Sequence, residues 1–460
     1  MIFQDSIIDG VEIRDVVLLG IPFLGYIISY FFDFKISFKA KPLSLIIMFT
    51  GFIFLSFNIP TRFEHKFNRL KHTHKENEAI PVLYSPFANL IHQYTTDFHS
   101  SFENPEYLVE NIISQNKKSL ANRSNGKKFE SIVIILVESF ESFVLNLEID
   151  GNEITPYLTN LSKEENTLYV PKIIPQVGVG RSIDAQLIIN SGLLPSPYEI
   201  FCFDYAGNEF PSIANLMRDK LGTALSIDII SDMPSIYNQG VLSSSLGYNR
   251  LLSRGDFTTN PKSLIHVDDS IFFVQAKDKL SNELWPIATP TVIQIVSYST
   301  HQPFKLPSTA AKMNFKTINK KLSKYLNAIR RTDYALKNFI EYLKNRGDYN
   351  SMLIIITGDH NVFSSEQYHE WGIDTISPYN RPYVPLIILN SEEKGKISEP
   401  KMQSAIFSTI LELSGMTDVE WPGISKSVFN NETDSEEKQE VSEYIIRHNY
   451  FQKSNLKGTK

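Results

Sequence analysis

Cysteine is almost absent from this chain. Cys202 is the single cysteine among 460 residues, so neither an internal disulfide nor a zinc site built from cysteine ligands can form. An excess of positive charge is also lacking, because 45 Lys and Arg residues face 51 Asp and Glu residues and leave a net charge of −6. Nucleic-acid-binding proteins neutralise phosphates with a basic face, so we expect no nucleic-acid partner.

Charged residues are missing altogether from two apolar runs near the N-terminus, 16–32 and 43–59. Each run is at the short end of the length that spans a bilayer. We therefore expect residues 1–60 to form a transmembrane hairpin that anchors the protein, and the alternative is a buried helical hairpin of a soluble protein. A signal peptide fits less well, since there are two runs and no small-residue cleavage site. Basic residues lie both between the runs and after the second, so charge alone leaves the orientation undecided.

Composition divides the remaining chain into three parts. Residues 61–127 are polar and predict a linker with a short helical arm, residues 128–431 alternate apolar strands with helices, and residues 432–460 form a polar, acidic C-terminal tail. The predicted strands are 131–137, 167–172, 224–230, 291–297, 352–357 and 384–389. The predicted helices are 182–192, 212–222, 268–280, 316–346 and 402–415.

The strand pattern favours an α/β fold. Runs such as "IVIILV" and "LIIIT" are continuously apolar, as in strands that are covered on both faces. Strands that alternate with helices form an α/β/α sandwich with a mostly parallel central sheet. Ligands of such sheets bind outside the carboxyl ends of the strands, so the ends of these runs are expected to converge on one site.

Acidic and imidazole side chains follow two of these runs. Glu138 comes directly after "IVIILV", and Asp359 and His360 follow "LIIIT" and Gly358. Two carboxylates and one imidazole form a mixed oxygen and nitrogen set that suits Mn²⁺, Mg²⁺ or Zn²⁺. The alternatives are a helix-capping role for Glu138 and an ordinary polar turn for the Asp–His pair.

A hydroxyl nucleophile is a second candidate. In "QVGVGRSIDAQLIINSG" (176–192) a glycine-rich approach leads through Arg181 to Ser182 at the start of a helix. Backbone N–H groups at a helix start favour an anionic phosphoryl group, although serine at this position is often only a cap. Arg181 either holds phosphate oxygens or faces solvent. His301, in "SYSTHQPF", either contacts a substrate oxygen or has a structural role.

Several ordered motifs together resemble one family. They are the strand before Glu138–Ser139, "TPYLTNL" (155–161), "GRSIDAQ…NSGLLP" (180–195), "FPSIANLM" (210–217), "STHQPF" (299–304), "YLNAIRRTDYALKNFIEYLK" (325–344) and "ITGDHN" (356–361). Over about 130–420 the chain is similar to the lipoteichoic acid synthase-like branch of the sulfatase/alkaline phosphatase superfamily.

The resemblance implies a membrane protein whose catalytic domain lies outside the cytoplasm. It implies one divalent metal, most often Mn²⁺, with Mg²⁺ or Zn²⁺ as alternatives, held by Glu138, Ser182, Asp359 and His360. Ser182 stands in the position of the nucleophile, and His301 in that of a histidine that contacts substrate. In the family, the nucleophile takes the head group of phosphatidylglycerol, and an acceptor then receives it.

Three positions depart from the family pattern. Ser182 stands where the branch usually has threonine, which is compatible with the same chemistry. The aromatic–Asn–Arg segment that binds the substrate phosphate matches Tyr237, Asn238 and Gln239, so its arginine is missing and the head-group specificity is in doubt. Two apolar runs replace the usual five helices, which indicates either a reduced anchor or an incomplete N-terminus. The C/S-x-P-x-R motif of sulfatases is absent around Ser182, which argues against sulfate ester hydrolysis.

The sequence therefore predicts a membrane-anchored, metal-dependent phosphotransferase. Its expected partners are a phospholipid donor of a phosphoglycerol-type head group and a glycan or lipid acceptor. A phosphoethanolamine transferase or a phosphodiesterase on the same fold is the second prediction. A catalytically inactive membrane scaffold is the third, and the complete set of candidate site residues argues against it.

Overall fold

The computed structural model describes residues 104–222, 225–258, 267–373, 382–431 and 436–452. These residues belong to one compact unit, Phe102–Lys460. The predicted transmembrane hairpin lies outside the described residues. Within the described ranges, no helix is both long enough and apolar enough to cross a membrane.

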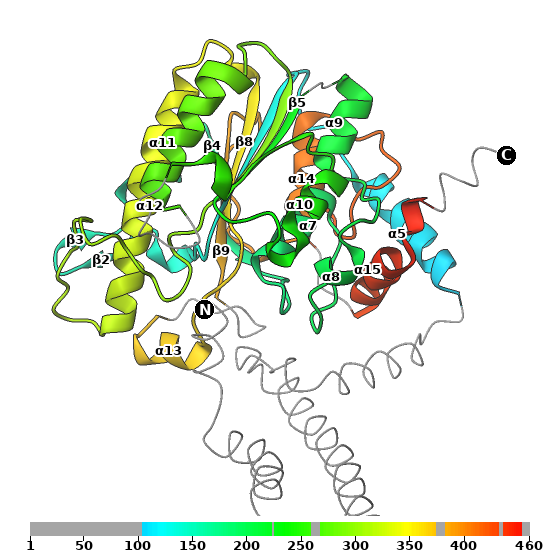
Figure 1. Ribbon diagram of the computed structural model, residues 1–460. Helices are drawn as coiled ribbons and strands as arrows, with labels where there is room; N and C mark the ends of the chain where they lie inside the picture. Colours follow the sequence, from blue (N-terminus) through cyan, green and yellow to red (C-terminus); the bar gives the residue numbers. More distant parts are fainter. Residues whose placement is uncertain (1–103, 223–224, 259–266, 374–381, 432–435, 453–460) are drawn as a thin grey trace, which may run out of the picture. The chain divides into compact units, whose positions relative to one another are not determined.

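A large sheet forms the centre of this unit, with strand order β10-β4-β9-β8-β1-β7-β5-β6 and β11 also paired with β4 (Figure 1). All six strands predicted from the sequence belong to it. They are β1 (Ser131–Val137), β4 (Thr167–Ile174), β5 (Leu225–Ile230), β7 (Thr291–Val296), β8 (Met352–Gly358) and β9 (Val384–Leu389). The short strands are β6 (Arg250–Leu252), β10 (Gly395–Lys396) and β11 (Lys401–Met402), while β2 (Glu148–Ile149) and β3 (Asn152–Glu153) form a separate hairpin.

The sheet is mostly parallel, as predicted. Strand β1 is parallel to both of its neighbours, β7 and β8. Strand β9 is antiparallel to β8 and to β4, whereas the other described pairs in the sheet run parallel. The carboxyl ends of β8, β1 and β7 therefore meet at the same edge of the sheet, side by side.

Helices cover both faces of the sheet (Figure 1). One layer contains α5 (Pro105–Ser119), α7 (Ser182–Ser191), α9 (Ile213–Leu221), α10 (Gln239–Ser245), α14 (Ala405–Ser414) and α15 (Glu436–His448). The other contains α6 (Pro156–Leu161), α11 (Asp269–Lys279) and α12 (Lys320–Lys344). The short helices α8 (Cys202–Tyr205) and α13 (Ser365–Glu370) lie in connections. The five helices predicted from the sequence are present as α7, α9, α11, α12 and α14.

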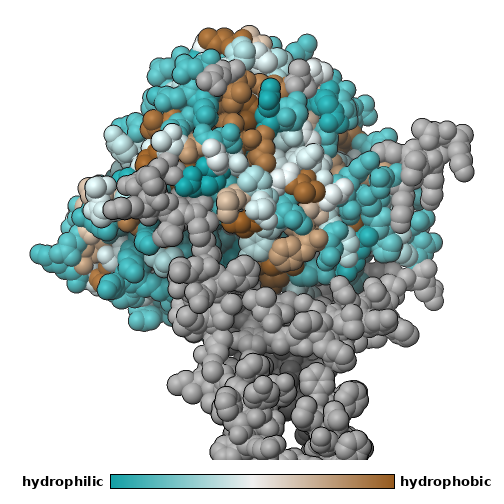
Figure 2. All heavy atoms as spheres, in the orientation of Figure 1, coloured by the Kyte–Doolittle hydropathy of each residue, from teal (hydrophilic) through white to brown (hydrophobic). Residues whose placement is uncertain are grey.

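Strand β1 shows why the sheet is buried on both sides. Its side chains alternate between the two faces, so a continuous apolar run contributes to two cores at once. Ile132, Ile134 and Leu136 pack in one core, and Val133, Ile135 and Val137 in the other. In Figure 2, hydrophobic residues gather in the middle of the face shown, where the sheet lies between the helical layers, and hydrophilic residues cover most of the outer parts.

The acidic segment that was expected to be a polar tail contains helix α15. Val441, Ile445 and Ile446 of this helix are buried, and further along the chain the Phe451 ring lies 5.5 Å from the ring of Trp421. The sequence interpretation relied on the acidic composition of 431–443. It missed that Val441 and Ile445 are spaced by one helical turn and form an apolar stripe.

Gly358 ends β8 where another part of the backbone passes close by. A Cβ atom at this position would lie 2.0 Å from the Phe140 carbonyl oxygen and 3.0 Å from the Val384 Cβ. We predict that Gly358→Ala lowers the free energy of unfolding by about 1–3 kcal/mol or more, because backbone atoms must move to make room. Chemical denaturation measures the effect. Gly347→Ala is the matched control, since no atom lies within 4 Å of its added Cβ, and equal loss in both variants would contradict the prediction.

Candidate metal centre and nucleophile

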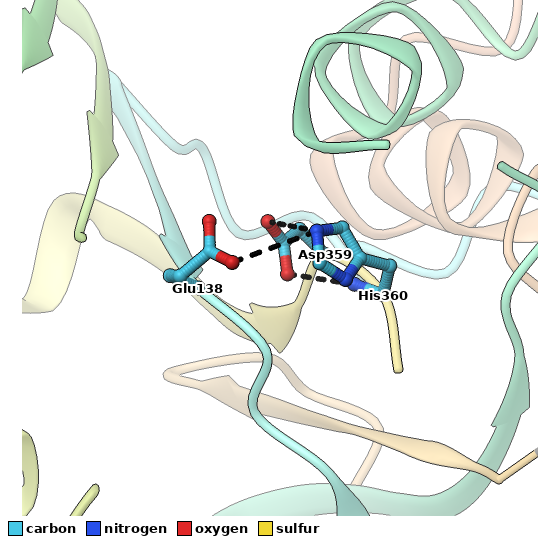
Figure 3. Close-up of side chains that lie close together, drawn as sticks. All are labelled: Glu138, Asp359 and His360. Carbon is cyan, nitrogen blue, oxygen red and sulfur yellow. Dashed lines mark hydrogen bonds and ion pairs between the residues drawn. The ribbon is translucent and has the colours of Figure 1, made fainter. Parts of the chain in front are cut away.

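Glu138, Asp359 and His360 come together at the carboxyl ends of the two central strands. Glu138 follows β1 and the other two follow β8, and Figure 3 shows both carboxylates facing the imidazole ring. One ligand atom from each of the three residues lies within 4.8 Å of the others. The His360 Nε2 is 3.5 Å from Glu138 Oε1 and 3.6 Å from Asp359 Oδ2. All three residues are buried, so the sequence prediction of a convergent site holds for them.

The carboxylate of Asp359 has one satisfied oxygen and one that lacks a partner. Its Oδ1 accepts hydrogen bonds from the backbone N–H of Ser139 at 2.7 Å and from that of His360 at 2.7 Å. Its Oδ2 is buried and has no hydrogen-bond partner among the described residues. A buried carboxylate oxygen without a partner is energetically costly unless a cation contacts it. This atom therefore supports the assignment of a cation site.

His360 is held in the form that binds metals. Its Nδ1 lies 2.8 Å from the backbone oxygen of Asn361. A carbonyl oxygen only accepts, so Nδ1 carries the proton and the Nε2 lone pair faces the two carboxylates. Burial lowers the pKa of His360 to about 4, so the ring is neutral at physiological pH.

Burial also changes the pKa of Glu138. It raises the pKa of the Glu138 carboxyl well above its ordinary value, and the nearby charge of Asp359 raises it further. Two buried carboxylates that repel each other are stabilised by a divalent cation placed between them. The charges, the neutral imidazole and the partnerless oxygen together fit one divalent metal ion at this position.

Ser182 completes the group, as the sequence suggested. It is the first residue of α7, and its Oγ lies 3.0 Å from Glu138 Oε2 and 3.1 Å from His360 Nε2. Residue Ser182 is only partly buried. A hydroxyl beside a cation site is a candidate nucleophile, because a bound cation lowers its pKa.

The loop before Ser182 is held by a residue of its own helix. Asp184 is buried, and its Oδ2 accepts hydrogen bonds from the backbone N–H of Gly178 at 2.9 Å and of Gly180 at 3.1 Å. Arg181 has φ 50° and ψ −114°, and its backbone N–H donates to the Gly178 carbonyl oxygen. The sequence interpretation expected amides at this helix start to attract a phosphoryl group. The amides of Gly178, Gly180 and Arg181 precede the helix and donate within the protein, to Asp184 and to the turn. The expectation for the amides of the helix start itself stays a prediction.

Arg181 lies beside the candidate metal centre. It is exposed, and one guanidinium nitrogen donates to the backbone oxygen of Asn361 at 3.1 Å. That contact links the loop after β8 to the loop before α7. A guanidinium has further donors that suit an anionic group, and the predicted role of Arg181 in holding phosphate oxygens stays a prediction.

His301 lies in the loop that follows β7. Its ring stacks on Tyr298 with 4.7 Å between centroids, and its Nδ1 is 2.6 Å from the Gln302 backbone oxygen. The proton therefore sits on Nδ1 and leaves Nε2 as an acceptor. Burial lowers the pKa of His301, and Arg181 adds to this effect while Asp359 opposes it. The ring is thus within electrostatic range of the metal centre.

In the segment Tyr237–Gln239, one side chain is exposed and the other two donate hydrogen bonds within the protein. Tyr237 is 40% exposed, so its phenol is partly buried. This partial burial raises the pKa of the phenol, whereas the charge of Arg181 lowers it, which places the phenol near Arg181. The Asn238 amide donates to the Cys202 carbonyl oxygen at 2.9 Å. The Gln239 amide is buried and donates to Gln186 Oε1 at 3.1 Å. Among these three predicted substrate contacts, Tyr237 has the side chain that is exposed near the site.

Glu141 is a site residue that the sequence reasoning missed. It is buried, its Oε1 accepts the backbone N–H of Val362 at 2.9 Å, and its Oε2 accepts the hydroxyl of Tyr368. It therefore ties the loop after β1 to the loop after β8 and to α13. The sequence interpretation gave Glu141 no role in the site, because both partners lie more than 200 residues further along the chain.

The metal-free protein is predicted to lose stability as pH rises from 7 to 8.5. Burial raises the pKa of Glu141 and of Asp184 to about 8, so in this range the folded chain holds protons that the unfolded chain has lost. Deprotonation then favours unfolding, by about 1 kcal/mol per pH unit at most for each group. Thermal unfolding in a chelator measures the effect. Glu141→Gln is expected to flatten the dependence, and a midpoint that rises with pH in this range would contradict the assignment.

Comparison with known proteins agrees with this geometry. The sulfatase family model matches residues 130–416. Lipoteichoic acid synthase 1 of Bacillus subtilis strain 168 is 24% identical over 338 residues, which cover 71% of this chain and 52% of the relative. The chain thus spans about half the length of this curated relative.

Solved structures share the fold. The lipoteichoic acid synthase LtaP from Listeria monocytogenes aligns with a TM-score of 0.60 and 18% identity, over 75% of this chain and 98% of that one. The Streptococcus pyogenes phosphoglycerol transferase GacH, solved with sn-glycerol-1-phosphate, aligns with a TM-score of 0.51 and 12% identity, over 75% and 93%. From the family match and the metal centre, the chain belongs to the sulfatase family, in the lipoteichoic acid synthase-like branch of the alkaline phosphatase superfamily.

Proposed function

We propose that this protein is a membrane-anchored, metal-dependent phosphotransferase. It takes a phosphoglycerol-type head group from a phospholipid and passes it to a glycan or lipid acceptor. The observation that carries the proposal is the placement of Ser182 Oγ within 3.1 Å of both Glu138 and His360. Residues 1–60 serve as the anchor, and the catalytic domain lies outside the cytoplasm, where such donors and acceptors meet.

The metal would be held by Glu138, Ser182, Asp359 and His360, with Mn²⁺ as the first candidate and Mg²⁺ or Zn²⁺ as alternatives. When bound, it supplies positive charge that lowers the pKa of the hydroxyl and neutralises charge on the phosphoryl oxygens. The chain's own residues provide the orientation. The hydrogen bond from Ser182 Oγ to Glu138 fixes the direction of the hydroxyl, and Glu141 holds the loop that carries His360.

The proposed reaction has two balanced steps. First, Ser182 Oγ attacks phosphorus, the bond from phosphorus to the lipid alcohol breaks, and the proton lost by the serine balances the proton gained by the alcohol. Second, an acceptor hydroxyl attacks the phosphoserine ester and gives its proton to His301 Nε2, and the bond from phosphorus to Ser182 Oγ breaks. The serine oxygen takes up one proton and His301 gives one up, which restores both residues. Arg181 and Tyr237 hold the phosphoryl group in both steps.

A phosphoethanolamine transferase or phosphodiesterase on the same scaffold is the second candidate. The observation that favours it is Gln239, a neutral and buried residue where the family has a phosphate-binding arginine. A different residue at this position is consistent with a different head group. A catalytically inactive scaffold is disfavoured by the complete set of Ser182, Glu138, Asp359 and His360.

The donor assay separates these functions. The full-length protein in liposomes is given phosphatidylglycerol or phosphatidylethanolamine with a labelled head group, with Mn²⁺ and with or without an acceptor glycan. We expect release of diacylglycerol from phosphatidylglycerol that accelerates when the acceptor is present. Turnover of phosphatidylethanolamine alone supports the second candidate, acceptor-independent release supports a phosphodiesterase, and no turnover with metal bound supports a scaffold.

A further inference from the structure

A polar hollow of about 380 Å³ lies at the edge of the sheet opposite the metal centre. Its lining includes Thr167, the first residue of β4, and Leu389, the last residue of the antiparallel β9. It also includes Asn350, which lies two residues before β8 begins. A seven-residue strand is roughly 23 Å long, so the hollow and the metal centre are separated by the length of the sheet.

The hollow is lined mainly by groups that bind charge and hydroxyls. Its charged residues are Lys127, Lys344, Lys394, Glu164 and Glu392, of which Lys344 and Glu164 form an ion pair at 3.4 Å. The remaining lining is mostly amide and hydroxyl side chains, with Leu389 as the single aliphatic residue in it. Pockets for drug-like ligands are predominantly apolar. A lining of this composition is suited instead to an anion that also carries hydroxyl groups.

Two of the lysines lie close together and use neutral partners. Lys127 Nζ donates to the backbone oxygen of Asn390 at 2.6 Å, and Lys394 Nζ donates to Asn166 Oδ1 at 2.9 Å. Burial lowers the pKa of Lys127, the charge of Glu392 opposes this, and the charge of Lys394 lowers the pKa further. Each ammonium has three donors. An anion that contacts both would use the remaining donors and relieve their repulsion.

Thr167 provides an independent observation. Its side chain is 2% exposed, and its Oγ1 has no hydrogen-bond partner among the described residues. A buried hydroxyl without a partner costs free energy in the unliganded protein. Thr167 is part of the lining, but its Oγ1 is itself buried, so a ligand in the hollow satisfies this hydroxyl once the side chain turns toward it.

We propose that this hollow is a second, non-catalytic binding site for a phosphorylated polyol. The ammonium groups of Lys127 and Lys394 bind the phosphate, and the carboxylate of Glu392 accepts hydrogen bonds from the polyol hydroxyls. Lys344 and Glu164, whose Nζ and Oε1 lie 3.4 Å apart, form an ion pair in the wall of the hollow. The volume suits one such unit, either free or as part of a polymer. The site stands apart from the catalytic residues, so it does not depend on the proposed transferase activity.

Calorimetric titration of the full-length protein in detergent tests the proposal. Glycerol phosphate is the probe, and excess chelator is present so that the metal centre cannot retain it. We expect one saturable site, weaker binding of inorganic phosphate and no binding of glycerol. The double variant Lys127→Met, Lys394→Gln is expected to bind at least tenfold more weakly. Lys396→Gln, an exposed lysine on β10 outside the lining, should remain within twofold of the unmodified protein.

Thr167→Val separates binding from folding. This change removes the partnerless hydroxyl while keeping the shape of the side chain. The thermal midpoint of the unliganded protein should therefore stay the same or rise. The affinity for glycerol phosphate should fall at least threefold. The absence of saturable binding, or binding that the double lysine variant leaves unchanged, would overturn the proposal. If a short poly(glycerol phosphate) binds more tightly than glycerol phosphate, the ligand is a polymer. If the two bind with equal affinity, the ligand is the free compound. Either result requires binding at this site.

Discussion

Ser182→Ala is expected to lower turnover by at least about a thousandfold while a divalent metal remains bound. The substitution removes the oxygen that attacks phosphorus, so no covalent intermediate can form. Glu138, Asp359 and His360 keep their positions, because their mutual arrangement is set by β1 and β8 and by backbone hydrogen bonds such as that from Ser139 to Asp359.

Two measurements check this expectation. Diacylglycerol release reports turnover, and elemental analysis of the purified protein reports metal content. Ser182→Thr is the matched control, since it keeps a hydroxyl at the same position and should retain activity within about two orders of magnitude of the unmodified protein. Unchanged turnover in Ser182→Ala would exclude Ser182 as the nucleophile, and loss of metal together with activity would show that Ser182 acts as a ligand first.

Asp359→Asn should lower the affinity for metal but raise the stability of the metal-free protein. The change removes a buried negative charge that provides a metal ligand, so the affinity for Mn²⁺ is expected to fall at least about a hundredfold. Without metal, the same change relieves repulsion between Asp359 and Glu138 and removes the buried, partnerless Oδ2 charge. The metal-free variant should therefore unfold at a higher temperature than the unmodified protein.

Thermal unfolding with a chelator and with increasing Mn²⁺ measures both effects in one experiment. Asp228→Asn is the matched control, because Asp228 is equally buried but lies within β5 and is bound to Gln294. It should leave the dependence on Mn²⁺ unchanged. A metal-free Asp359→Asn protein that is less stable than the unmodified protein would show that the carboxylate is needed for folding rather than for metal binding.

The sheet and the candidate metal ligands were predictable from sequence because one pattern encodes both. A continuously apolar run predicts a strand with two covered faces, and the residue at its carboxyl end must then lie at the edge where ligands bind. Glu138 and Asp359 satisfy this rule directly. Ser182 was predicted less directly, since its role depends on where α7 is placed against the sheet.

Other site residues were not predictable in this way. Glu141 and Asp184 act through backbone N–H groups, which every residue carries except proline, so no side-chain pattern marks their partners. Gln239 had been aligned with a phosphate-binding residue, and its buried contact with Gln186 depends on tertiary packing. The apolar stripe of α15 was not recognised from the sequence, because acidic residues dominate the composition around it.

The way Asp184 holds the loop before Ser182 determines where specificity for the transferred group is encoded. Phosphate-binding loops of many enzymes recognise their ligand with main-chain groups, which side-chain substitution leaves in place. Here the amides of Gly178 and Gly180 are already occupied. For the proposed phosphotransferase, recognition by these two amides is therefore excluded, and side chains such as Arg181 would have a larger share in it, so single substitutions could change the substrate preference of this protein without rebuilding the loop.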